Sequence, residues 1–119
     1  MEYIFYGLLA LVIILFIKSF LPVKGVRNIT VEQLREELGD KGKQFVDVRT
    51  AAEYKAFHIR GFKNIPLHQL EQKASTLAKD KEVVLICQSG VRSMRAAKIL
   101  KKAGFAKITN VKGGVNAWR

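Results

Sequence analysis

The stretch from Val83 to Ser93 constrains the fold of this chain more than any other. It begins with a continuous apolar and mostly β-branched run, Val-Val-Leu-Ile, which is typical of a strand that is covered on both faces. The run ends at Cys87, a short turn containing Gly90 follows, and a basic helical pattern begins at Ser93. We therefore expect a central strand, a tight loop and a helix, with the only cysteine of the chain at the carboxyl end of the strand.

Strand and helix patterns alternate along the chain on both sides of this stretch. Thr30 with Gln33 and Thr50 with Glu53 each form the sequence signature of a helix-capping box. The expected strands occupy 25–29, 44–48, 83–86 and 108–111, with a short one before residue 66. The alternation predicts an α/β fold in which helices cover both faces of a central, largely parallel sheet.

The N-terminal segment predicts a membrane anchor. Tyr3 to Ile17 is a run of fifteen residues without a charge, and residues 18–23 could extend it through the interface. Glu2 and the lack of a small-residue cleavage site argue against a cleaved signal peptide. Basic residues follow the run at Lys18 and Lys24. We expect residues 1–23 to be one transmembrane helix with its N-terminus outside, and residues 24–119 to be one domain in the cytoplasm.

The formal net charge of +11 restricts the class of partner. A nucleic-acid-binding protein would have such a charge, but the sequence lacks the aromatic signature, zinc-ligand spacing and lysine-arginine blocks of those modules. We therefore expect no nucleic-acid partner, and interpret the charge as a solvated basic surface beside a membrane. A basic stripe that follows the loop, Arg95, Lys98, Lys101 and Lys102, would in addition attract anionic donors or acidic carriers.

The position of Cys87 allows two interpretations. A free cysteine is often a small buried hydrophobic residue, and Cys87 ends an apolar strand. A loop that turns backbone N–H groups toward the sulfur, followed by a helix N-terminus and Arg92, would instead stabilise a nucleophilic thiolate. Gly90, Arg92 and Ser93 in this context favour the nucleophile. Because the chain has one cysteine, it has neither an internal disulfide nor a resolving thiol.

The region from Val26 to Trp118 resembles a single rhodanese domain, the sulfurtransferase module of the rhodanese superfamily. The motifs that carry the resemblance occur in the order and approximate spacing of that family. They are Asp47-Val48-Arg49 with Glu53-Tyr54, His58-Ile59, Asn64-Ile65-Pro66-Leu67, the loop Cys87-Gln88-Ser89-Gly90-Val91-Arg92-Ser93, and Gly113-Gly114-Val115-Asn116-Ala117-Trp118.

The resemblance implies a thiosulfate:cyanide type of sulfurtransferase that needs no cofactor. Cys87 would take a sulfane sulfur from a small anion such as thiosulfate, form a persulfide, and pass the sulfur to cyanide, a small thiol or a protein thiol. The N–H groups of the loop residues would hold the persulfide, and Arg92 would bind the anionic donor. The loop residues in this assignment are Gln88, Ser89, Gly90, Val91 and Arg92.

Two departures from the family pattern concern the rim of the site. Phe57 and Phe62 stand where relatives usually have glycine and alanine, and we expect these aromatic rings to reshape the surroundings of the loop.

A phosphatase or arsenate reductase of the related Cdc25 type is a second hypothesis. It would have five residues between cysteine and arginine, whereas four separate Cys87 from Arg92. A non-catalytic or sensory docking module at the membrane is the third.

The remaining polar residues are expected to support the loop. Charged groups at strand ends usually pair with one another, so Asp47, Arg49 and Glu53 are expected to brace neighbouring loops, with substrate binding as the alternative. His58 and His68 have no further ligands at metal spacing, and we expect no metal site. Ser93 would support the loop, Gly113 and Gly114 would let the backbone approach it, and Trp118 would pack in the core.

Overall fold

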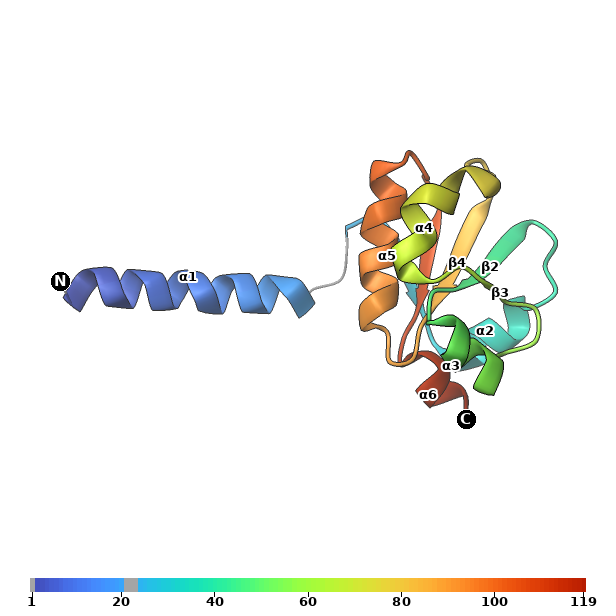
Figure 1. Ribbon diagram of the computed structural model, residues 1–119, viewed down its shortest axis with the longest axis horizontal. Helices are drawn as coiled ribbons and strands as arrows, with labels where there is room; N and C mark the ends of the chain where they lie inside the picture. The colour runs from blue at the N-terminus through green and yellow to red at the C-terminus, as the bar shows by residue number, and fades with distance from the viewer. Residues whose placement is uncertain (1, 21–23) are drawn as a thin grey trace.

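The computed structural model describes residues 2–20 and 24–119, and among them a sheet of five parallel strands forms the centre of one domain (Figure 1). The strand order is β1-β5-β4-β2-β3. The strands are β1 (Val26–Ile29), β2 (Lys43–Asp47), β3 (Lys63–Asn64), β4 (Glu82–Ile86) and β5 (Ile108–Val111). The predicted α/β fold with a central parallel sheet is confirmed, and the Val83–Ile86 run lies in its middle strand.

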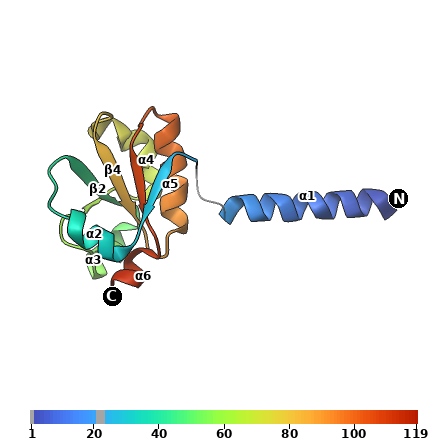
Figure 2. The ribbon, with the colours of Figure 1, turned by 180° about the vertical axis from the view of Figure 1, so that it is seen from behind.

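Helices connect the strands and cover both faces of the sheet, as Figures 1 and 2 show from opposite sides. These helices are α2 (Val31–Glu37), α3 (Ala51–Ala56), α4 (Leu67–Lys73), the 3-10 turn η1 (Ala74–Thr76), α5 (Val91–Lys102) and α6 (Gly114–Trp118). Both predicted capping boxes are present. Thr30 accepts a hydrogen bond from the Gln33 N–H, and Thr50 accepts one from the Glu53 N–H, each at 3.2 Å.

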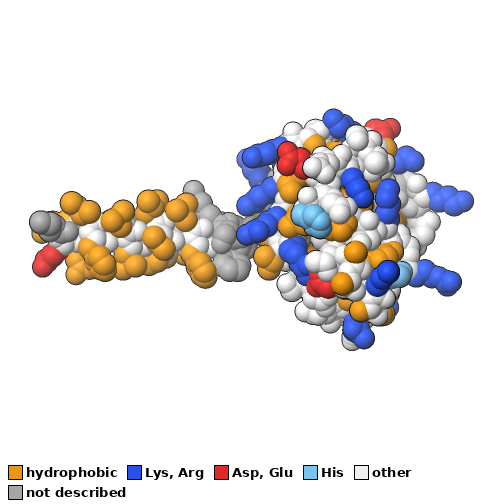
Figure 3. Space-filling model, in the orientation of Figure 1, with side chains coloured by type: hydrophobic (Ala, Val, Ile, Leu, Met, Phe, Trp, Pro, Cys, Tyr) orange, Lys and Arg blue, Asp and Glu red, His pale blue; other side chains and the backbone are white. Residues whose placement is uncertain are grey.

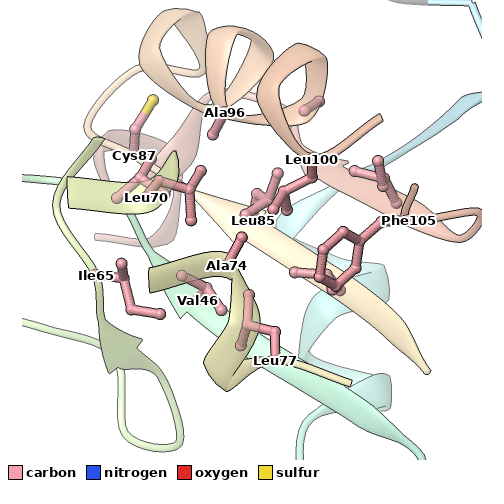
Figure 4. Close-up of a cluster of buried hydrophobic side chains, with 14 residues drawn as sticks. Val46, Ile65, Leu70, Ala74, Leu77, Leu85, Cys87, Ala96, Leu100 and Phe105 are labelled. Atoms are coloured by element: carbon pink, nitrogen blue, oxygen red, sulfur yellow. The ribbon is translucent and has the colours of Figure 1, made fainter. Parts of the chain in front are cut away.

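Two hydrophobic clusters hold the helices on the sheet. Alternate residues of β4 point to opposite faces, so Leu85 and Cys87 join the cluster beneath α4 and α5 (Figure 4), whereas Val84 and Ile86 join the other cluster. The second cluster packs Leu34 of α2 and Val115 of α6 against the sheet. Trp118, which was expected in the core, is only partly buried and packs at the margin of this cluster. A strand with fully buried residues on both faces explains why its sequence is apolar without alternation.

The site lies where the carboxyl end of β4 meets those of its neighbours. The strand order reverses at β4, because β4 pairs with β5 on one side and with β2 on the other. Ligands of open α/β sheets bind at such a reversal of strand order. Cys87 follows β4, Arg49 comes shortly after β2, and Gly114 begins α6 after β5, so three connections converge on one edge.

The helix α1 (Glu2–Phe20) extends away from the domain, and its apolar side chains are exposed (Figures 1 and 3). No helix within the described residues is long and apolar enough to cross a bilayer. The predicted transmembrane anchor is therefore wrong, and so are the membrane partner and the single-pass topology that depended on it. The fifteen uncharged residues of Tyr3 to Ile17 rise about 22 Å, against the roughly 30 Å of a hydrocarbon core. The expected extension through residues 21–23 lies outside the described residues.

Candidate active site

Cys87 is completely buried at the end of β4, and its sulfur points toward α5 (Figure 4). The Gly90 N–H donates a hydrogen bond to Sγ at 2.9 Å, and the thiol donates to the Ser93 hydroxyl oxygen at 3.4 Å. Because α5 begins at Val91, the positive end of its dipole also lies beside the sulfur. A backbone donor and a helix N-terminus are the groups that stabilise a thiolate.

The loop takes its shape from Gly90, the residue that precedes α5. Gly90 has a φ of 107°, in a region that residues with a side chain rarely adopt. This conformation folds the chain back so that the Gly90 N–H reaches the sulfur three residues earlier. The Gly90 carbonyl in turn lies 3.0 Å from the Ser93 hydroxyl, which ties the loop to the first turn of α5.

The first turn of α6 supports the loop through backbone contacts. The Val115 N–H donates to the Cys87 carbonyl at 2.9 Å, and the Asn116 N–H donates to the Gln88 carbonyl at 3.0 Å. A Cβ on Gly114 would lie 2.2 Å from the Cys87 carbonyl oxygen, so only glycine permits this approach. The expectation that this glycine brings the backbone to the loop is confirmed. Asn116 adds a contact that sequence reasoning missed, because its amide oxygen accepts from the Gln88 side chain at 2.5 Å.

Asp47 and Arg49 form a buried ion pair beneath the loop. The Arg49 guanidinium donates to the Asp47 carboxylate at 2.8 Å, and both side chains are almost fully buried. Arg49 also donates to the Gln88 side-chain oxygen at 3.2 Å and to the Phe57 carbonyl at 2.6 Å. The pair therefore joins the end of β2 to the active loop and to the end of α3, which is a bracing arrangement.

Arg92, the last residue of the loop, is held by Glu53. Its two terminal nitrogens donate to the two carboxylate oxygens of Glu53 at 2.7 and 2.9 Å. This bidentate pair lowers the pKa of Glu53 from 4.5 to about 2. Desolvation partly opposes the shift, and hydrogen bonds from Thr50 add to it. The hydrogen bonds to Glu53 likewise raise the pKa of Arg92 above its usual value.

A chain of hydrogen-bonded side chains leads from the sulfur toward β1, and sequence reasoning missed it. The Ser93 hydroxyl lies 2.5 Å from the Asn110 side-chain oxygen, and the Asn110 amide donates to Asn28 at 3.1 Å. Asn28 and Asn110 line a cavity of about 360 Å³ beside Ser89 and Val91. The one available sequence signal was the pair of polar residues, Thr109 and Asn110, between the apolar ends of this short strand.

The other predicted residues lie away from the sulfur. His58 is exposed, its ring stacks on Tyr54 at 3.8 Å, and its Nδ1 lies 2.9 Å from the Tyr54 carbonyl. Phe62 does not line the rim. It is buried in the core, edge-on to Phe45 at 5.5 Å, while Phe57 is half-buried beneath the Arg119 guanidinium. The described residues contain no group of three His, Cys, Asp or Glu side chains suited to a metal ion.

Comparisons with known proteins agree with this geometry. Residues 30–119 match the Rhodanese-like domain family. The uncharacterized protein YqhL of Bacillus subtilis is 43% identical over 93 residues, covering 78% of this chain and 72% of that protein. A sulfurtransferase of Allochromatium vinosum is 35% identical over 94 residues, covering 78% and 88%. The crystal structure of a rhodanese-like domain protein from Staphylococcus aureus superposes with a TM-score of 0.73 at 32% identity, covering 79% and 92%. The chain belongs to the rhodanese-like family, whose members include sulfurtransferases.

Proposed function

We propose that residues 24–119 are a sulfurtransferase unit that carries a sulfane sulfur on Cys87. The main support for this proposal is the 2.9 Å hydrogen bond from the Gly90 N–H to the Cys87 sulfur, which lies beside the start of α5. That arrangement stabilises negative charge on the sulfur and on a persulfide attached to it. The relatives that are named sulfurtransferases support the same assignment.

The first half-reaction loads the cysteine. The Cys87 thiolate attacks the outer sulfur of a donor such as thiosulfate, the S–S bond of the donor breaks, and sulfite leaves with the electron pair of that bond. Cys87 then carries a persulfide. The loop from Gln88 to Arg92 surrounds the added sulfur, and Ser93 supports the loop through its contacts with the Gly90 carbonyl and the Cys87 thiol.

The second half-reaction passes the sulfur to a nucleophile from outside the chain. Since Cys87 is the only cysteine, no thiol of the same chain can accept the sulfur. Cyanide, a small thiol or a protein thiol attacks the outer persulfide sulfur and releases the Cys87 thiolate. A similar protein of Bacillus subtilis, 37% identical over 94 residues, is described as a putative sulfur carrier, which supports a thiol-containing protein as one class of acceptor.

Steady-state kinetics with the full chain test this function. Thiocyanate formation from thiosulfate and cyanide should show parallel lines in double-reciprocal plots, as a covalent intermediate requires. Cys87→Ser should abolish turnover while leaving the circular dichroism spectrum unchanged. A fully folded wild-type chain that transfers no sulfur from thiosulfate, polysulfide or an organic persulfide would instead support a non-catalytic docking module.

A further inference from the structure

The charge of Arg92 is already balanced in the absence of any donor. Both terminal nitrogens of its guanidinium are used by the Glu53 carboxylate, at 2.7 and 2.9 Å. The pair is partly open to solvent, with about a third of each side chain exposed, 34% for Arg92 and 33% for Glu53. A donor can therefore reach the pair, but it meets an arginine whose positive charge is offset by a carboxylate at hydrogen-bonding distance.

The second arginine at the loop is balanced as well. Arg49 contacts the loop through Gln88, yet its guanidinium is bound to the buried carboxylate of Asp47. Among the described residues that contact the loop, both arginines thus belong to ion pairs that sum to zero charge. At the sulfur itself an anion then meets the Gly90 N–H and the N-terminus of α5, while Lys112 is exposed on the lining of the neighbouring cavity.

The groups at the sulfur itself suit one negative charge better than two. A helix N-terminus contributes roughly half an elementary charge, and a backbone N–H contributes a dipole. Both interact favourably with a single negative charge placed at the sulfur. A dianion such as thiosulfate approaching that thiolate also needs a full positive charge nearby, and here the charge of Arg92 is offset by Glu53.

We propose that Glu53 sets the donor class by neutralising Arg92, so that the site disfavours dianionic donors such as thiosulfate and favours organic persulfides. This inference rests on the proposed sulfurtransferase function. With a persulfide R–S–SH, the Cys87 thiolate attacks the terminal sulfur and the S–S bond breaks. R–S⁻ leaves with the electron pair, and Cys87 becomes Cys87–S–SH. No oxidant, reductant or further charge is required.

The variant Glu53→Gln isolates the charge of Glu53 from its structural role. Glu53 is also the third residue of the Thr50 capping box, where its Oε1 accepts from the Thr50 N–H at 3.1 Å. Glutamine serves equally well at this position of a capping box, so α3 should keep its start while Arg92 gains an unbalanced charge. Glu32→Gln is the matched control, because it removes the same charge from an exposed position on α2.

The first readout measures anion binding without sulfur transfer. Cys87 is alkylated with iodoacetamide in increasing sulfate, an unreactive dianion, against sodium chloride of equal ionic strength. We expect the sulfate concentration for half-protection to fall about tenfold in Glu53→Gln relative to wild type, and to stay unchanged in Glu32→Gln. Equal protection of wild type and Glu53→Gln, or protection of neither, would overturn the assignment of Glu53. The protection assay needs no sulfur transfer, so its result bears on Glu53 even if the chain proves not to be a sulfurtransferase.

The second readout compares two donors. The ratio of kcat/KM for thiosulfate to kcat/KM for glutathione persulfide should rise about tenfold in Glu53→Gln, mainly through the KM for thiosulfate. In an Arg92→Gln background the same Glu53 substitution should leave the ratio unchanged, because Glu53 acts through Arg92. An unchanged ratio in the single variant would refute the inference while leaving the sulfurtransferase function intact. A failure of both donors to load Cys87 would refute the function.

Discussion

Replacing Asp47 by asparagine should destabilise the domain severely. The carboxylate of Asp47 is the counter-charge of Arg49, whose side chain is only 3% exposed, and it also accepts the Arg49 backbone N–H at 3.0 Å. Asparagine keeps the size and one acceptor but leaves the guanidinium as a buried charge without a counter-ion. Breaking a buried pair from one side typically costs about 3–5 kcal/mol. The total free energy of unfolding of a small domain is about 5–15 kcal/mol, so this loss is a large part of it.

Thermal and denaturant unfolding of the full chain measure this cost. For a domain of this size each kcal/mol shifts the midpoint by about 4–8 °C, so we expect Asp47→Asn to lower Tm by at least about 12 °C. Asp80→Asn makes the same chemical change at an exposed loop position and should leave Tm nearly unchanged. A loss below about 1 kcal/mol, the value of a surface ion pair, would refute the view that this pair is a buried brace.

Three further perturbations test other parts of the account. Gly114→Ala would place a Cβ 2.2 Å from the Cys87 carbonyl and should reduce sulfur transfer at least about tenfold. Gly39 also has a positive φ, 93° against 58° for Gly114, but a Cβ there would meet no other atom. Equal losses in Gly39→Ala and Gly114→Ala would therefore argue against a clash at the loop. Arg92 lowers the pKa of Glu53 to about 2, so the pair stabilises the folded state above pH 4.5 and loses this effect as the pH falls toward 2. The Tm difference between wild type and Glu53→Gln should therefore shrink between neutral pH and pH 2. A constant difference would contradict a stabilising role of the Glu53–Arg92 pair. Phe62→Ala should cost about 3–5 kcal/mol in urea unfolding, since Phe62 lies in the core, and a loss under about 1 kcal/mol would place its ring at the rim instead.

Much of the fold could be predicted from local patterns. The Val83–Ile86 run indicated a strand buried on both faces, and it is the middle strand of the sheet. The two capping boxes located the starts of α2 and α3, because the Thr30 and Thr50 side chains act on neighbours three residues away. Such features depend on short stretches of chain, which a sequence displays directly.

Contacts between distant residues could not be predicted in the same way. Asn110 meets Ser93 only after β5 has been placed beside β4, and Arg92 meets Glu53 across 39 positions of sequence. Phe62 was expected at the rim because it stands where relatives usually have alanine, but its ring turns inward to Phe45. The transmembrane prediction failed for a different reason, because the uncharged run of fifteen residues is shorter than the roughly 20 that a helical span needs.

Mass spectrometry shows whether Cys87 can carry a sulfane sulfur. The full chain is incubated with glutathione persulfide or thiosulfate, freed of excess donor, and digested without reducing agent. We expect the peptide containing Cys87 to gain the mass of one sulfur atom, and cyanide to remove this mass as thiocyanate. Cys87→Ser should never acquire it. An unmodified Cys87 peptide after incubation with either donor, from a chain shown to be folded, would contradict the claim that this loop carries sulfur.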